Sequence, residues 1–274
     1  MIRAFKRVVP TPVVVDQAPA IRIEWVLERS FAQPGPYSFK VLQLEGPSDQ
    51  QPRVVSAGGD GHWTYDLQPR LSQVGRMVFY QVILTDAEGR EWESPATPLD
   101  TSWGGRDWRI ARSIVKGAWQ ALRKRTGTAG WLVKRRYWGT PCPDCVDPIT
   151  MQVDNPNCGT CYGTAFAEGY HDPVPYWVQV EQANRVSSLR PDDGHVRDSR
   201  MALTGLAYPC PEPGDLWIMA GSDRRFRIGD QVQASAIHRG VNLILQMQGV
   251  ELPISDAVYG IELPTREVID ASPL

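Results

Sequence analysis

Long hydrophobic runs are missing from this sequence of 274 residues: none approaches the length of about 18 residues that spans a bilayer. The N-terminus also lacks the apolar core of a signal peptide, so we expect neither a cleaved leader nor a membrane contact. Intrinsic disorder is not expected either. Charged residues make up 22% of the chain and hydrophobic residues 42%, as in ordinary globular proteins.

Catalytic signatures are missing as well. The chain contains no Gly-x-Ser-x-Gly, no His-Glu-x-x-His, no phosphate-binding loop and no dinucleotide-binding fingerprint. The histidines fall in separate contexts and build no motif: they are His62, His171, His195 and His238. We therefore predict that the protein is not an enzyme.

Glycine, proline and tryptophan are abundant. The chain has 24 Gly and 23 Pro residues, which favour many turns and short strands over long helices. Its 10 Trp residues are expected either as large anchors in several small cores or as contact surfaces that become buried in an assembly. The composition therefore predicts a mainly β fold.

Residues 1–100 are expected to form strands. Apolar side chains alternate in two stretches, and each set would share one face of a strand: Ile21, Ile23 and Trp25, and Val78, Tyr80, Val82 and Leu84. An early Trp, a Tyr-x-Val-x-Leu strand, a Gly-containing turn and a Ser-Pro exit resemble a fibronectin type III domain; the residues are Trp25, Tyr80, Val82, Leu84, Gly89, Ser94 and Pro95. That resemblance implies a fibronectin III/Ig-like β-sandwich, a module that usually binds, spaces or decorates.

The net charge of −2 conceals a basic segment. From Arg106 to Arg136, ten Lys or Arg residues stand against one acid, Asp107, whereas residues 137–274 carry nine basic and eighteen acidic residues. Such a segment needs a partner charge or must stay solvated. The partner could be phosphate or the acidic C-terminal part of a neighbouring copy, which would build a ring or a filament.

Part of this segment is predicted to be a helix that runs from Asp107, its cap, to about Arg125. Apolar residues at near-helical spacing would form its inner face: Ile110, Ile114, Val115, Ala118, Trp119 and Leu122. Most of the basic residues would then lie on the opposite face.

The most informative motif is a pair of Cys-x2-Cys units separated by twelve residues: Cys142, Cys145, Cys158 and Cys161. Each unit can point two sulfurs at one ion, and two such knuckles complete a tetrahedral site. Zinc is the expected ion, with iron in a rubredoxin-like site as the minor option. Four protein ligands leave no open position for water or substrate, so the expected role is structural.

Two disulfides are the alternative, and the isolated Cys210 is expected to be a small buried side chain.

Residues 173–274 alternate again in short strands joined by Gly and Asp turns, which predicts a small β-barrel-like domain. Three regions are thus expected in a mainly β chain. They are a β-sandwich (1–100), a basic helix with a four-cysteine, zinc-ribbon-like segment (101–172), and a β-rich, barrel-like assembly domain (173–274).

The segment from Arg135 to Tyr170 contains Arg-Arg-Tyr-Trp-Gly, both cysteine pairs and a final Gly-Tyr. It resembles a segment of structural proteins of tailed bacteriophages that are encoded among the head and neck genes. The β-rich run that follows Pro213 is similar to the small barrels of head-closure and neck proteins. The second knuckle also resembles the Cys-x2-Cys-x-Gly-x-Gly units of chaperone zinc domains, with Ala165 in place of the last Gly.

The phage resemblance implies a non-enzymatic virion protein of the neck or head–tail connection, assembled as a ring in the host bacterial cytoplasm. Its partners would be further copies of itself and other head, neck or tail proteins, and Arg106–Arg136 could contact packaged DNA. The alternative is a zinc-ribbon protein that binds nucleic acid, since aromatic residues beside Arg can stack on bases.

Overall fold

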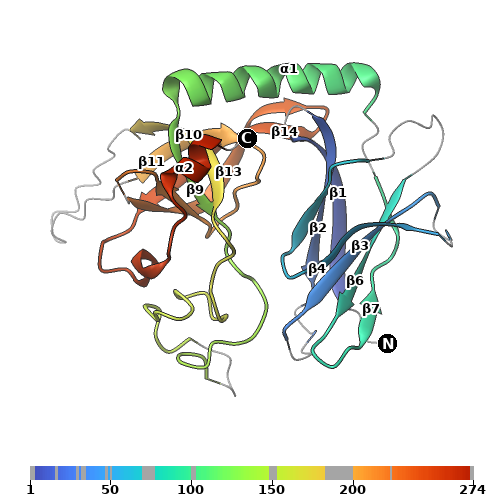
Figure 1. Ribbon diagram of the computed structural model, residues 1–274, viewed down its shortest axis with the longest axis horizontal. Helices are drawn as coiled ribbons and strands as arrows, with labels where there is room; N and C mark the ends of the chain where they lie inside the picture. The colour runs from blue at the N-terminus through green and yellow to red at the C-terminus, as the bar shows by residue number, and fades with distance from the viewer. Residues whose placement is uncertain are drawn as a thin grey trace.

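The computed structural model describes residues 4–15, 18–28, 31, 35–46, 49, 51–69, 78–99, 103–147, 153–182, 200–222 and 224–271. Strands dominate, as predicted, and the long helix α1 (Gly105–Ala121) runs along one side of the molecule (Figure 1). Within these ranges, no helix combines the length and the apolar character that crossing a membrane requires.

The N-terminal strands form two antiparallel sheets. The strands are β1 (Phe5–Val15), β2 (Ala18–Leu27), β3 (Ser38–Leu44), β4 (Arg53–Gly59), β5 (Trp63–Asp66), β6 (Phe79–Thr85), β7 (Glu91–Glu93) and β8 (Thr97–Pro98). One sheet has the order β1-β2-β5, and the other has the order β4-β3-β6-β7 with β8 beside β6.

A shared apolar core joins these two sheets, and the alternating residues of the sequence lie in it: Ile21, Ile23, Trp25, Tyr80, Val82 and Leu84. These residues confirm the predicted alternations. Strand β6 begins at Phe79, so Val78, the first residue of its predicted set, precedes the strand and packs half-buried against the same core.

Six strands close into a barrel with the order β10-β11-β14-β13-β12-β9. The strands are β9 (Thr128–Val133), β10 (Val174–Gln182), β11 (Arg200–Leu206), β12 (Leu216–Met219), β13 (Arg225–His238) and β14 (Val241–Glu251). The predicted C-terminal barrel is thus present. It is closed by β9, which comes from the middle of the chain and pairs with both β10 and β12. The short elements η2 (Ala257–Gly260) and α2 (Arg266–Ala271) follow, and they add Val258 and Ile269 to a second core cluster beside β9 and β12.

Helix α1 occupies the expected region, but the predicted cap is wrong. Gly104 is the cap residue, and Asp107 is the third helical residue, whose carboxylate accepts a hydrogen bond from Gly104 N at 3.0 Å. A carboxylate in the first turn is stabilised there by the partial positive charge of the helix N-terminus. The helix continues into a π-helical turn, η1 (Leu122–Thr126). Its inner face is also rotated from the prediction: Ile110 is exposed, and the buried apolar residues are Trp108, Ala111, Val115 and Leu122.

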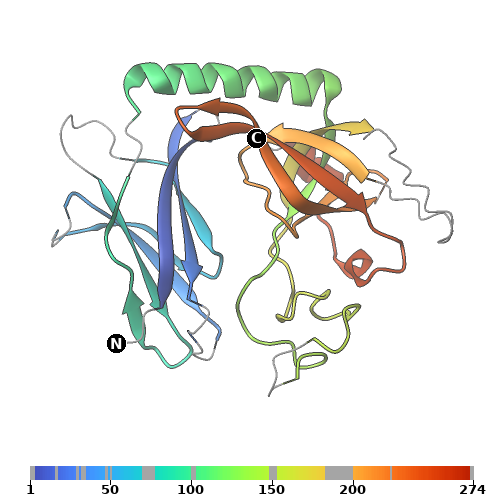
Figure 2. The ribbon, with the colours of Figure 1, turned by 180° about the vertical axis from the view of Figure 1, so that it is seen from behind.

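The β13–β14 hairpin ties the barrel to the sandwich. In Figures 1 and 2 the hairpin reaches out of the barrel and passes beneath α1 towards β1. One core cluster contains residues of the sandwich, of α1 and of the hairpin; those of α1 and the hairpin are Trp108, Ala111, Val115, Val241 and Leu243. At the tip, His238 and Arg239 pair with Asp107 at 3.2 and 3.0 Å. A continuous core therefore holds the sandwich, the helix and the barrel together.

Most of the tryptophans serve as anchors of these cores. All ten lie in the described parts of the chain, none of them is exposed, and eight belong to a core cluster or pack against one: Trp25, Trp92, Trp103, Trp108, Trp131, Trp138, Trp177 and Trp217. The first of the two expected roles is confirmed for these eight, and contact surfaces in an assembly stay a prediction.

A group of buried charges makes a second link between the sandwich and the barrel. Lys134, which follows β9, donates from Nζ to Glu212 Oε2 and, at 2.6 Å, to Asp215 Oδ2. Glu212 also contacts Arg22 of β2 at 3.2 Å and His62 Nε2 at 2.9 Å. Burial alone would raise the pKa of Glu212, but the hydrogen bond to His62 and the charge of Lys134 hold it well below its usual range.

Candidate metal centre

The four cysteines lie in the long segment that connects β9 to β10, at the end of the molecule opposite α1 (Figures 1 and 2). We call residues 140–172 the cysteine lobe; its described parts are 140–147 and 153–172. All four Sγ atoms lie within 4.8 Å of one another, and each residue is at most 5% exposed. The predicted residues are therefore brought together: Cys142, Cys145, Cys158 and Cys161.

The sulfur separations fit a shared ion better than disulfides. Cys142 Sγ and Cys158 Sγ lie 3.8 Å apart, and Cys145 Sγ and Cys161 Sγ lie 3.3 Å apart. A tetrahedral zinc ion with Zn–S bonds of about 2.3 Å places its sulfurs about 3.8 Å from one another, whereas a disulfide requires about 2.05 Å. The four buried cysteines are thus close enough to bind a metal ion, and both zinc and iron suit four thiolates.

Backbone amides favour the charged form of one sulfur. The N–H groups of Cys161 and Thr160 donate to Cys158 Sγ and lower the pKa of that thiol to about 7. Burial raises the pKa of the Cys142 and Cys145 thiols, so these sulfurs become thiolates when a cation compensates their charge. A bound cation would therefore make the burial of four thiolates favourable.

The lobe has little other core. Besides the four cysteines, the cluster of buried side chains at its centre draws on Val146 and Val153 among the described residues. Isolated bridges, such as those between Val146 and Val153 and between Pro141 and Phe166, take the place of strands. Because so little apolar area is buried, a bound metal would supply the folding free energy of this segment.

Left-handed backbone shapes the turns after the second knuckle. Gly163 and Gly169 have φ values of 76° and 61°. A Cβ on Gly163 would lie 2.6 Å from Pro156 O, and one on Gly169 would lie 2.4 Å from Cys161 O. Ala165 has a φ of 75° although it carries a Cβ. It stands where the resembling chaperone units have glycine, so the backbone keeps a conformation that glycine adopts more easily.

We therefore expect Ala165→Gly to stabilise the lobe. A non-glycine residue in left-handed backbone costs about 1–2 kcal/mol, and the greater freedom of glycine in the unfolded chain offsets part of this gain. The net gain should be up to about 1 kcal/mol, measured as slower proteolysis within the lobe and slower loss of its metal to a chelator. Ala167→Gly is the matched control, because its φ is not among the positive values, and it should destabilise the lobe. Equal effects of the two changes would contradict this explanation.

Side chains anchor the lobe to both halves of the molecule. Asn157 accepts a hydrogen bond from Ala257 N at 2.6 Å and donates to Ser255 O at 3.3 Å, which fixes the second knuckle to the segment around η2. Arg136 pairs with Glu168 at 2.8 Å and with Asp60 of the sandwich. These contacts join residues that are 32 to 100 positions apart, so no local sequence pattern could reveal them.

The remaining candidate ligands lie elsewhere. His171 packs edge-on against Trp63 with ring centroids 5.3 Å apart and faces Asp60, and it does not belong to the cysteine group. Cys210 is half-buried against the barrel core, as a small side chain, and is also outside that group. His195 lies outside the described residues.

His171 should make the stability of the protein depend on pH. Burial and the charge of Arg136 lower its pKa from 6.5 to about 4. A histidine with a lowered folded pKa stabilises the fold fully above pH 6.5, and this contribution is lost as the pH falls from 6.5 to 4. We expect the free energy of unfolding to drop by at most about 3 kcal/mol over this range. Denaturation followed by Trp fluorescence would measure it, and His171→Phe should flatten the profile; an unchanged profile would contradict the assignment.

The fold places the ten basic residues of the segment in different surroundings. The residues of α1 and η1 are exposed except for the half-buried Arg123: Arg106, Arg109, Arg112, Lys116, Arg123, Lys124 and Arg125. Lys134 and Arg136 instead pair with acidic residues of this chain, and Arg135 lies over the ring of Tyr137. Part of the charge partner predicted for the segment is thus internal.

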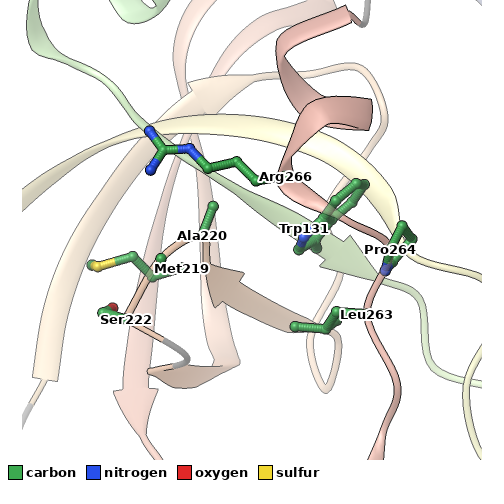
Figure 3. A pocket seen from close by; sticks show the side chains of 8 residues that line it. Trp131, Met219, Ala220, Ser222, Leu263, Pro264 and Arg266 are labelled. Carbon is green, nitrogen blue, oxygen red and sulfur yellow. The ribbon is translucent and has the colours of Figure 1, made fainter.

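A separate hollow of about 390 Å³ lies beside the barrel (Figure 3). Its lining residues come from β9, from the β12 end and from the segment before α2: Trp131, Met219, Ala220, Gly221, Ser222, Leu263, Pro264 and Arg266. Among the described residues that line it, Arg266 is the charged one.

Comparisons of the chain with models of protein families, with curated proteins and with solved structures find no match. The geometry of the cysteine lobe and the surface of α1 are therefore the basis for a functional proposal.

Proposed function

We propose that this chain is a non-enzymatic structural component of a tailed-phage virion, at the neck or head–tail connection. It assembles there as a ring through its basic helix and its β-rich C-terminal part. The observation that carries the proposal is the closed cluster of four buried sulfurs, which forms most of the core of the cysteine lobe. A site with four protein ligands leaves no position for a substrate, so it supports an architectural role.

The two sheets support the fibronectin III-like part of the proposal. The first, second and fifth strands form one sheet, and the third, fourth, sixth and seventh form the other. This is the strand order of a fibronectin type III sandwich. The core shared with α1 and the β13–β14 hairpin supports a rigid building block, in which the sandwich is held in a fixed position.

The proposed metal is Zn²⁺, held by the four cysteines of the lobe: Cys142, Cys145, Cys158 and Cys161. The ion would cross-link two loops that are separated by twelve residues and would fix the lobe against the barrel. A structural zinc site of this kind needs thiolates, which is consistent with assembly in the reducing cytoplasm of a bacterial host.

Native mass spectrometry of the purified chain at low ionic strength tests the proposal, because it reports subunit number and metal content together. A closed ring with one zinc ion per chain is the expected result. A chain that stays monomeric alone and with head or neck proteins of a tailed phage would overturn the proposal.

The exposed basic face of α1 favours one alternative, a zinc-ribbon protein that binds nucleic acid. In that case the monomer should bind duplex or single-stranded DNA, and its affinity should fall steeply with salt because counterions are released. Fluorescence anisotropy with labelled DNA measures this. The acidic surface at the opposite end of the molecule opposes this alternative.

A further inference from the structure

We infer that α1 of one copy binds the cysteine lobe of the next copy, so that the chain assembles head to tail. This inference rests on the proposed ring: it keeps the basic helix as one contact surface and assigns the other to the cysteine lobe, which precedes the β-rich C-terminal part. One surface is the outer face of α1 and η1, and the other is the surface of the lobe.

The helix surface carries charge of one sign. Arg109, Arg112 and Lys116 are exposed and lie three and four positions apart, which places them on the same side of the helix. The acid of this helix, Asp107, is buried and already pairs with His238 and Arg239. A row of like charges at this spacing destabilises an isolated helix. In the described parts of this chain no acidic side chain pairs with Arg109, Arg112 or Lys116, so an acidic partner would offset their mutual repulsion.

The cysteine lobe carries the opposite charge. No Lys or Arg occurs between Arg136 and Arg185, and five acidic residues lie in the lobe: Asp144, Asp147, Asp154, Glu168 and Asp172. Of these, Asp144, Asp154, Glu168 and Asp172 are exposed. Four thiolates around one divalent ion add a charge of −2 to this surface. The lobe is therefore acidic throughout, and it becomes most acidic in the metal-loaded form.

The positions of the two surfaces suit association between copies. Figures 1 and 2 show α1 along one end of the molecule and the cysteine lobe at the other end. The lobe therefore cannot neutralise its own helix. When two complementary patches lie on different faces of a subunit, each contact leaves one patch of each kind open, and repetition produces a ring or a filament. Because the two patches lie on nearly opposite faces, each subunit is rotated little relative to the next, and a ring of many subunits is favoured over a small ring.

Variants that reverse the sign of the charge on each surface test the inference. One variant reverses the helix (Arg109→Glu with Lys116→Glu), and the other reverses the lobe (Asp154→Lys with Asp172→Lys); all four residues are exposed. Each variant alone should lose at least tenfold in self-association affinity at low salt, measured by analytical ultracentrifugation. An equimolar mixture should regain it, because the acidic helix of one variant then meets the basic lobe of the other. Both variants must retain the metal content and the denaturation midpoint of the unchanged protein.

Other outcomes overturn the inference in distinguishable ways. If both variants form rings as the unchanged chain does, the ring uses surfaces other than the helix and the lobe, and the virion role stands while the assembly through the basic helix is rejected. If the helix variant loses DNA binding while the lobe variant keeps it, and the unchanged chain is a monomer at low salt, nucleic acid is the partner of α1. Loss in both variants without recovery in the mixture also rejects the contact.

Discussion

Replacing Cys142 with serine is expected to remove the metal and to unfold the cysteine lobe while the barrel stays folded. The lobe buries its four sulfurs with little else around them, whereas the barrel has its own core around Trp217 and Phe226. Structural zinc contributes about 10–16 kcal/mol of apparent binding free energy in small zinc-finger peptides at neutral pH. Even the loss of an outer-shell hydrogen bond costs about 10–100-fold in metal affinity, so the loss of a ligand should cost more.

Metal analysis and limited proteolysis check this expectation together. The unchanged chain should carry one zinc ion and resist cleavage within residues 140–172, and Cys142→Ser should carry none and be cut there. Cys210→Ser is the matched control, because Cys210 is outside the cysteine group and should leave both properties unchanged. Full metal content in Cys142→Ser would reject a four-thiolate site.

The disulfide alternative gives a different result in the same samples. Cys142 Sγ lies 3.8 Å from Cys158 Sγ and Cys145 Sγ lies 3.3 Å from Cys161 Sγ, and both separations exceed a sulfur–sulfur bond by more than about 1 Å. A metal-free chain whose intact mass is four hydrogens below that of the reduced chain would establish two disulfides. In that case two disulfides, and not zinc, would cross-link the lobe, and the proposed architectural role would be unchanged.

Local patterns in the sequence were sufficient for the metal ligands and for many strands. Two Cys-x2-Cys units can only point inward together if the chain folds one over the other, so their spacing alone predicts the cluster. Alternation likewise predicts the buried face of β6, because side chains in a strand alternate between two environments. In α1 the pattern of apolar residues predicts the helix but not its buried face or its cap. Asp107 faces the core because it contacts His238, which lies 131 positions away, and no local pattern indicates that contact.

Long-range pairing limited the rest of the prediction. Strand β9 lies in the region for which the sequence predicts a helix and a cysteine segment, yet it closes the barrel by pairing with residues up to 89 positions away, such as Met219. Lys134 and Arg136 looked like a continuation of the basic helix because neighbours in sequence carry the same charge. Their partners, Glu212 and Asp60, come from other parts of the chain, so composition could not separate the buried cations from the exposed ones.

Lys134→Met is expected to destabilise the whole protein by about 3–5 kcal/mol. The side chain of Lys134 is 3% exposed, and its ammonium group donates to Glu212, to Asp215 and to the carbonyl oxygen of Cys210. Methionine fills a similar volume but removes the cation that pairs with Asp215, while Glu212 keeps its contacts with Arg22 and His62. Asp215 is fully buried, so its negative charge would remain in a medium of low dielectric constant. For a chain of this size the melting temperature should fall by roughly 10 °C.

Two further variants separate the buried charge from the loss of packing. Lys124→Met removes an exposed lysine from η1 and should change stability by less than about 0.5 kcal/mol. Lys134→Met combined with Glu212→Gln and Asp215→Asn removes the opposing carboxylates as well, and it should regain much of the lost stability. Replacing a buried ion pair with neutral groups is often far less costly than breaking it. If the triple variant is no more stable than Lys134→Met, packing of the lysine stem, and not its charge, holds this part of the barrel to the sandwich.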